Sequence, residues 1–341
     1  MSLKRKMFFA TGAAIAAGLV TRKALHRQRY FDLNEKICVI AGGSRGLGLA
    51  IARVLAAKGA RLALLARDEE ELRRAQAELR NRGTDVFIKT CDISDKSQVD
   101  QAIAAVRDQF GHIDCLLNVA GMISVGPHET MSLEDYEHAL SAHFYGPLHT
   151  MLAVLPEFEG RRSGRIVNVS SIGGKVAAPH LVPYSASKFA LVGLSEGLRS
   201  EVAKYNVFVT TVCPGLMQTG SPRHASFKGD AEKEYSWFAT ADNIPGVSIS
   251  PAAMAKHIVR AMQFGEPELI YPLSASLGSR LNGLFPGFTA ELSAMIEKIL
   301  PRGRAREAVK GMNLKSTHVP RFIKSIDEQN AAAHNETAST R

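Results

Sequence analysis

Cysteine is scarce in this sequence, and the cysteines that occur are not arranged for metal binding or for disulfide bonds. No two are spaced Cys-x-x-Cys, and none is accompanied by a paired histidine. Each lies in or at the end of an apolar, strand-like run, as small buried side chains in a reducing compartment do. The four are Cys38, Cys91, Cys115 and Cys213. We therefore expect no disulfide and no metal site.

A long apolar run is also lacking. The candidate for a membrane segment, Met7 to Val20, has fourteen mostly apolar residues, which as a helix cover about 21 Å of a hydrocarbon core of about 30 Å. Basic residues flank it on both sides and suit anionic headgroups. We expect residues 1–30 to be a membrane anchor, through residues 7–20, on a cytoplasmic protein. A cleaved export signal and a soluble capping helix are the alternatives.

Acidic residues are missing from the N-terminus, and this makes the net charge of +9 misleading. Residues 1–30 carry seven Lys or Arg and no acid, and residues 301–341 carry eight against four acids. The body, 31–300, has 27 basic and 29 acidic residues. A nearly neutral body gives no basic face for a phosphate backbone, so nucleic acid is not an expected partner.

No internal repeat divides the chain, and short β-branched runs alternate with longer amphipathic stretches from residue 36 onward. The expected strands are 37–40, 61–65, 86–90, 114–119, 166–169, 207–212 and 269–271, and the expected helices are 47–58, 69–81, 97–110, 133–155, 184–205 and 251–264. Strands that are apolar on both faces and joined by helices predict a single α/β domain. Its Rossmann-like, doubly wound parallel sheet would have about seven strands with helices on both faces.

This domain should cover residues 31–272, with residues 221–250 as a segment over the substrate. Residues 273–300 form an amphipathic helical extension that could cover the pocket, pack in a dimer or touch lipid, and core cover is the favoured interpretation. From 301 to 341 the sequence is polar and loses its periodicity, so we expect a mostly disordered tail.

The first strand runs directly into a glycine-rich turn before a helix, an arrangement typical of dinucleotide binding. Its glycines allow a pyrophosphate to approach the backbone, and the helix N-terminus supplies amide donors. A plain structural turn is the alternative. The expected cofactor contacts in the turn are Gly42, Ser44, Arg45, Gly46, Leu47 and Gly48.

The end of the second strand favours NADP(H) over NAD. An NAD site places an acid there for the ribose hydroxyls, but the sequence has Ala66 followed by Arg67, and Arg45 lies in the glycine turn. Two guanidiniums suit a 2′-phosphate. In the alternative, Arg67 caps the sheet and Arg45 faces solvent.

Tyr184 and Lys188 lie one helical turn apart, thirteen residues after Ser171 ends an apolar run. An ammonium near a phenol favours the phenolate, so Lys188 would lower the pKa of Tyr184 towards neutrality and let it exchange a proton with a substrate oxygen. A chance pair on a solvated helix face is the alternative.

Together these motifs resemble the short-chain dehydrogenase/reductase family, in its compact single-domain branch, from about Lys36 to about Tyr271. Gly42, Gly46 and Gly48 match its glycine loop, although Ala41 stands where Thr is common. The resemblance assigns catalysis to Ser171, Tyr184 and Lys188, with the last two also contacting the cofactor. Further implied cofactor contacts are Asp92 at the adenine, Asn118 and Ala120 in an altered Asn-Asn-Ala-Gly motif, and Pro214, Gly215 and Thr219 at the nicotinamide.

One residue departs from the family pattern. His143 stands three residues before Gly146, where the family usually has an Asn that supports a proton relay to the lysine. An imidazole can donate and accept, so a relay through His143 that titrates near neutral pH is one interpretation. A packed, hydrogen-bonded histidine is the other.

The resemblance implies NADP(H)-dependent interconversion of a ketone or aldehyde and an alcohol. Apolar residues around the expected pocket favour a lipophilic small-molecule substrate. By analogy with the family, the chain would form a homo-oligomer. Two alternatives are a catalytically impaired, membrane-associated NADPH-binding sensor or scaffold, and an epimerase or dehydratase of the extended branch. The latter typically carries a larger C-terminal domain, which this sequence lacks.

Overall fold

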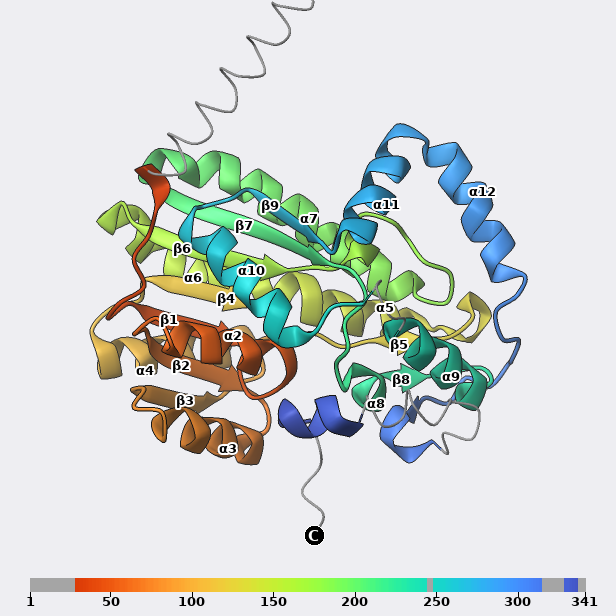
Figure 1. Cartoon of the computed structure of the whole chain (residues 1–341), viewed down its shortest axis with the longest axis horizontal. Coiled ribbons are helices and arrows are strands. Elements are labelled where there is room, and N and C mark those ends of the chain that lie inside the picture. Colours follow the sequence, from red (N-terminus) through yellow and green to blue (C-terminus); the bar gives the residue numbers. More distant parts are fainter. Residues whose placement is uncertain (1–27, 244–247, 315–327, 337–341) are drawn as a thin grey trace, which may run out of the picture.

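The computed structural model describes residues 28–243, 248–314 and 328–336. The predictions for residues 1–27 lie outside these ranges. Seven parallel strands form the main sheet in the order β3-β2-β1-β4-β6-β7-β9 (Figure 1). Their bounds are β1 Ile37–Ala41, β2 Arg61–Ala66, β3 Val86–Thr90, β4 Cys115–Asn118, β6 Gly164–Val169, β7 Val207–Pro214 and β9 Glu268–Tyr271. The predicted fold class is confirmed.

Alternation along β1 shows why both faces of the sheet need helices. Cys38 and Ile40 point into one apolar cluster, whereas Ile37, Val39 and Ala41 point into the other. The first cluster is covered by α2 Gly46–Ala56, α3 Glu69–Arg80 and α10 Pro251–Gln263. The second is covered by α4 Lys96–Phe110, α6 Gly146–Arg161 and α7 Val182–Val202. The four cysteines are buried and free.

The predicted helix over 133–155 is three successive pieces. Helix α5 Leu133–Leu140 continues through a π-helical turn, Ser141–Tyr145, into α6. An extra residue in a helical turn shifts the face that later side chains present, and such turns often occur at functional sites. Here the π turn carries His143.

A second, three-stranded sheet lies beside the carboxyl ends of the main one. It joins β5 Ser124–Val125, β8 Ser226–Phe227 and β10 Val309–Lys310 in the order β10-β8-β5. The disordered-tail prediction is therefore wrong for residues 309–314, because β10 pairs with β8 and Leu314 packs on the same small core. The partner strand lies about eighty residues away in sequence, so the tail's own composition could not reveal it.

Within the segment predicted to cover the substrate, the structure has α8 Ser221–His224, β8 and α9 Ala231–Asp242. Its aromatics Phe227, Tyr235 and Phe238 pack with Val125 in a small core of their own. A buried polar contact fixes α9: Glu234 accepts from Trp237 Nε1 at 2.6 Å and lies 2.8 Å from Nδ1 of His180. The segment is thus attached to the body at two places.

Helices α11 Leu273–Leu284 and α12 Pro286–Glu297 form a hairpin at one end of the molecule (Figure 1). The interpretation of this extension as core cover is not what the structure shows. Ten of its apolar side chains are exposed: Leu273, Leu277, Leu281, Leu284, Phe285, Phe288, Leu292, Met295, Ile296 and Ile299. Within the described ranges, none of the helices has the length and apolar character needed to cross a bilayer.

Candidate active site

The glycine turn leaves β1 at the carboxyl edge of the sheet, where β1 lies between β2 and β4. Gly42 has φ +88°, and a Cβ there would lie 2.6 Å from the amide nitrogen of Ala120. A Cβ on Gly48 would overlap the carbonyl oxygen of Gly42. Leu47 is buried beneath the turn. Strand order reverses at this point, and open parallel sheets bind ligands there.

Ser171, Tyr184 and Lys188 come together at the same edge of the sheet. Ser171 follows β6, its Oγ accepts from the Gly173 N–H at 3.0 Å, and its side chain is hydrogen-bonded to Tyr184. Tyr184 and Lys188 lie on α7. Lys188 Nζ donates to the carbonyl oxygen of Val169 at 3.0 Å and lies 5.7 Å from the centre of the Tyr184 ring. The geometry thus joins a hydroxyl, a phenol and an ammonium.

The protonation of this group differs from the sequence expectation. Burial raises the pKa of Tyr184 to about 12, although its hydrogen bond to Ser171 works in the opposite direction. The predicted lowering of the tyrosine pKa is wrong here, because the effect of burial outweighs that of the hydrogen bond to Ser171, and Lys188 Nζ instead donates to a backbone carbonyl. Burial also lowers the pKa of Lys188 to about 8. At neutral pH Tyr184 therefore retains a proton that it can donate.

His143 is almost fully buried in the π turn and is engaged at both ring nitrogens. Nε2 accepts from the Met122 N–H at 3.1 Å, and Nδ1 lies 2.8 Å from Ser187 Oγ, which in turn donates to the Tyr184 carbonyl. Burial, and then the Lys188 cation, hold the pKa of His143 well below its usual value. The expected titration near neutral pH is therefore wrong. A neutral His143 therefore links the π turn to Ser187 near the N-terminus of α7.

Other predicted cofactor contacts line the same edge. Pro214 ends β7, Gly215 follows it, and Thr219 is buried with its hydroxyl against Ser221. Asp92 follows β3 and accepts from the Ser94 N–H at 2.9 Å. Asn118 is different, because its amide is bonded to Asn168 at 2.9 Å and its carbonyl to Thr150 at 2.7 Å. Its contacts tie β4 to β6 and α6.

Three basic side chains gather at the end of β2, and we call them the basic group: Arg45, Arg67 and Lys310. Arg67 is largely exposed and lies 4.0 Å from Asp92. Burial, and then the positive charges of Arg67 and Arg45, lower the pKa of Lys310, which places β10 in the same group. The sequence did not point to Lys310, nor to Glu71. Glu71 on α3 accepts from Ser44 at 2.9 Å and from Arg45 at 3.1 Å.

The C-terminal residues 328–336 also reach this edge, which the sequence did not predict. The Gly46 N–H donates to the His334 carbonyl at 2.9 Å, and the Gly220 N–H donates to Glu336 Oε2 at 2.5 Å. Asn335 Nδ2 donates to the Ser44 carbonyl at 2.8 Å. The prediction of disorder is therefore wrong for these residues too, because the glycine turn and Gly220 after β7 hydrogen-bond to them.

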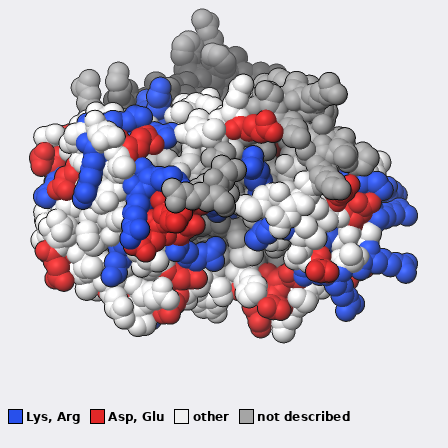
Figure 2. All heavy atoms as spheres, turned by 90° about the horizontal axis from the view of Figure 1, so that it is seen from below, with Lys and Arg blue, Asp and Glu red and all other residues white. Residues whose placement is uncertain are grey.

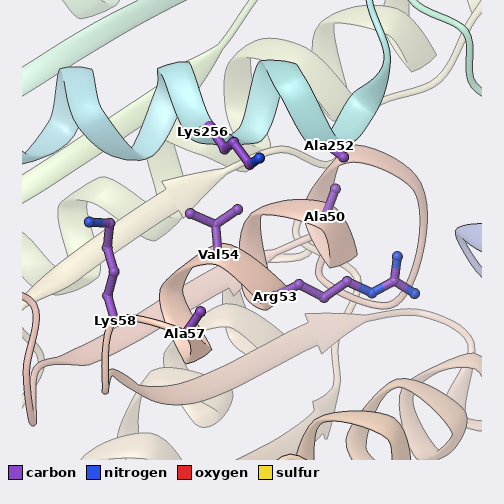
Figure 3. A pocket seen from close by; sticks show the side chains of 7 residues that line it. All are labelled: Ala50, Arg53, Val54, Ala57, Lys58, Ala252 and Lys256. Carbon is purple, nitrogen blue, oxygen red and sulfur yellow. The ribbon is translucent and has the colours of Figure 1, made fainter.

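A pocket of about 370 Å³ lies between α2 and α10 (Figure 3). It is lined by Ala50, Arg53, Val54, Ala57, Lys58, Ala252 and Lys256. None of these is among the residues predicted to act in catalysis or to bind the cofactor. Across the described parts of the chain, no three His, Cys, Asp or Glu side chains are placed to hold a metal ion.

Comparison with known proteins decides the family. The short chain dehydrogenase family model matches residues 36–227. Dehydrogenase/reductase SDR family member 7B of Danio rerio is 32% identical over 259 residues, which cover 73% of this chain and 82% of that protein. This chain belongs to the short-chain dehydrogenase/reductase (SDR) family. As a member, it is an oxidoreductase that acts on CH–OH and C=O groups.

Further SDR relatives include ketoreductases. The granaticin polyketide synthase putative ketoacyl reductase 1 of Streptomyces violaceoruber is 38% identical over 187 residues, 54% of this chain and 69% of its own length. A solved short-chain dehydrogenase from Streptomyces avermitilis has a TM-score of 0.66 and 29% identity, covering 77% of this chain and 96% of that one. The actinorhodin polyketide ketoreductase variant F189W, solved with NADPH, has a TM-score of 0.62 and 28% identity over 69% of this chain and 95% of its own.

Proposed function

We propose that this SDR protein is an NADP(H)-dependent reductase or dehydrogenase that interconverts a lipophilic ketone or aldehyde and the corresponding alcohol. The observation that carries the proposal is the hydrogen-bonded Ser171 and Tyr184 with Lys188 beside them, at the edge of the sheet where the glycine turn begins. The solved relative that contains NADPH is itself a ketoreductase.

The residues at this edge fit a dinucleotide. Backbone N–H groups of Gly46 and Gly220 already hold two oxygen atoms of the chain, one of them from a carboxylate. Donors that hold a carboxylate also suit a phosphate. Gly42, Gly46 and Gly48 would admit the pyrophosphate, Asp92 would meet the adenine, and Pro214, Gly215 and Thr219 would meet the nicotinamide.

A bound nicotinamide supplies the hydride for reduction and accepts it in oxidation. In reduction, Tyr184 Oη would donate its proton to the carbonyl oxygen, so that the carbonyl, the hydride received by its carbon and this proton together make the alcohol. The Ser171 hydroxyl donates a hydrogen bond to that same oxygen and stabilises its developing negative charge. Lys188 keeps a positive charge beside the phenolate that Tyr184 leaves, until a proton from solvent restores the phenol.

A screen of carbonyl compounds tests the activity. Protein and NADPH are mixed with medium- and long-chain aldehydes, ketones and β-keto esters, and absorbance of the reduced nicotinamide is followed. We expect turnover with at least one lipophilic member. If NADPH binds but its absorbance stays constant with every compound, the alternative is favoured, namely an NADPH-binding scaffold that does not turn over.

The cofactor preference rests on the basic group at the end of β2. Arg67, Lys310 and Arg45 would face a 2′-phosphate, whereas Glu71 is an acid within the same group. Asp68, the acid nearest in sequence to the end of β2, caps α3 by accepting from the Glu71 N–H at 2.8 Å. The Asp68 carboxylate is thus bound at the N-terminus of α3, and Ala66 stands where an NAD site places an acid.

Arg67→Ala combined with Lys310→Ala should weaken NADPH binding by about tenfold or more, because each lost phosphate contact costs on the order of 1 kcal/mol. NADH lacks the 2′-phosphate, so its dissociation constant for the double variant should stay within about twofold of its value for the unchanged protein. Dissociation constants from fluorescence titration check this, with exposed Arg73→Ala on α3 as the control. A parent protein that prefers NADH would contradict the proposal and assign Glu71 to the ribose hydroxyls.

We further propose that the α11–α12 hairpin contacts an anionic membrane surface. Support comes from its exposed apolar residues, Leu284, Phe285 and Phe288 at the hairpin turn among them, and from Arg302, Arg304 and Arg306 just beyond it. Figure 2 shows Lys and Arg beside Asp and Glu over much of the underside of the molecule.

Leu284→Ser with Phe288→Ser should lower binding of the full chain to phosphatidylserine-containing vesicles by about tenfold or more. Each buried apolar side chain contributes roughly 1.5–3 kcal/mol to such binding. Co-flotation measures the bound fraction, and Leu133→Ser, which removes an exposed leucine of α5, is the control. Equal flotation of the parent and the double variant would show that the hairpin does not contribute.

A further inference from the structure

The C-terminal segment 328–336 lies across the opening of the glycine turn. In Figure 1 it is the dark blue helix below α2, between α3 and α8. Residues 328–333 are helical, and Ala331, His334 and Glu336 are buried. A terminal segment whose side chains bury this completely is docked in a specific position.

Its contacts join both walls of the expected dinucleotide site. On the side of α2, the Gly46 N–H binds the His334 carbonyl, and Arg53 Nη2 donates to the Ala333 carbonyl at 2.9 Å. On the side after β7, the Gly220 N–H binds Glu336 Oε2. A Cβ on Gly46 would lie 2.8 Å from Glu336 Oε1, so this carboxylate fills the space directly above the turn.

Side chains from α3 and α8 add to this docking. Arg74 Nε donates to Asn335 Oδ1 at 2.7 Å, and Asn335 Nδ2 donates to the carbonyl of Glu71 at 3.1 Å. His224 Nε2 lies 3.2 Å from the Glu336 carbonyl. The segment therefore contacts the same surfaces, from the glycine turn to the basic group, that the proposed cofactor would contact.

We propose that residues 328–336 form an autoinhibitory segment that competes with the dinucleotide for the glycine turn, with the Glu336 carboxylate in the position of a cofactor phosphate. This inference rests on the proposed function, because it concerns regulation of that site. The segment and a diphosphate cannot both accept from the Gly46 and Gly220 N–H groups. Cofactor binding therefore requires the segment to leave, and the apparent affinity falls by the fraction of molecules in which it has left.

Two features make such competition effective. The segment belongs to the same chain, so its local concentration at the site does not fall when the protein is diluted. Its carboxylate also adds a negative charge next to the place where the phosphates would bind. Any partner that captures the C-terminus would open the site and raise the apparent affinity for the cofactor.

The test compares NADPH dissociation constants, by fluorescence titration, of the full chain, a chain ending at residue 327, Glu336→Ala and Glu328→Ala. The deletion should lower the dissociation constant by about tenfold and Glu336→Ala by about fivefold, since each raises the open fraction. Glu328→Ala removes the same charge from an exposed position, so its NADPH dissociation constant should stay within about twofold of that of the full chain. Thermal unfolding confirms that each chain is folded.

A synthetic peptide of residues 328–336 should also inhibit NADPH binding to the shortened chain competitively. Equal or weaker binding of NADPH after the deletion and after Glu336→Ala would overturn the inference while leaving the proposed function intact. Failure of every chain, shortened ones included, to bind NADPH or NADH would overturn both.

Discussion

Tyr184→Phe should lower kcat/KM for carbonyl reduction by about a thousandfold, within the range of a lost general acid. The substitution removes only Oη, the atom that carries the proton. NADPH affinity should stay within about twofold, because the turn that would hold the pyrophosphate is formed by other residues. Initial rates and fluorescence titration measure the two quantities. Tyr205→Phe, before β7 at the opposite edge of the sheet, is the control.

The same variant shows whether Tyr184 acts as a general acid or only contributes to the shape of the pocket. Since burial holds the pKa of Tyr184 near 12, the parent phenol stays protonated throughout the neutral range and can donate at every pH tested. A Tyr184→Phe protein that keeps more than about a tenth of the parent rate would contradict the assigned role.

Lys188→Met should lower turnover by about a hundredfold or more and at the same time change how stability depends on pH. The folded pKa of Lys188, about 8, is below its usual 10.5. Between these values the unfolded chain binds more protons, so the parent's stability rises with pH across this window and the penalty of burying the cation is largest below pH 8. Methionine is also unbranched, one heavy atom shorter than lysine, and has no proton to lose.

The free energy of unfolding of Lys188→Met, relative to the parent, should therefore be more favourable at pH 7 than at pH 9.5 by about 2 kcal/mol. Urea unfolding at both pH values measures this difference. Lys58→Met, at an exposed lysine after α2, is the control for turnover. A difference that is the same at both pH values would show that Lys188 is not buried as a cation.

The main sheet could be predicted closely because its strands are apolar on both faces. Strand β2, for example, was expected over 61–65 and spans Arg61–Ala66. The glycine turn and the grouping of Ser171 with Tyr184 and Lys188 also followed from sequence. The glycine turn and Ser171 follow parallel strands, whose carboxyl ends lie at one edge of the sheet. Tyr184 and Lys188 lie on α7, and the family resemblance placed them at that edge.

What the sequence did not predict depends on contacts distant in the chain or on burial. Strand β10 and the docked segment around Glu336 have polar sequences whose partners lie far away. The pKa of Tyr184 was predicted in the wrong direction because helical spacing gives no information on the depth of the phenol or the direction of Lys188 Nζ. Glu71 was not predicted, because it is one of several charged residues in α3 and the sequence does not show which of them contacts Arg45.

Deuterium transfer tests the central claim most directly. The chain ending at residue 327 is incubated with NADPH labelled at the transferable C4 position and with the carbonyl compound that reacts best, and the product is analysed by mass spectrometry. We expect this chain to form an alcohol with one deuterium on the former carbonyl carbon, and the same chain carrying Tyr184→Phe to form almost none. An unlabelled alcohol, or an equal yield of labelled alcohol from the Tyr184→Phe chain, would contradict the account.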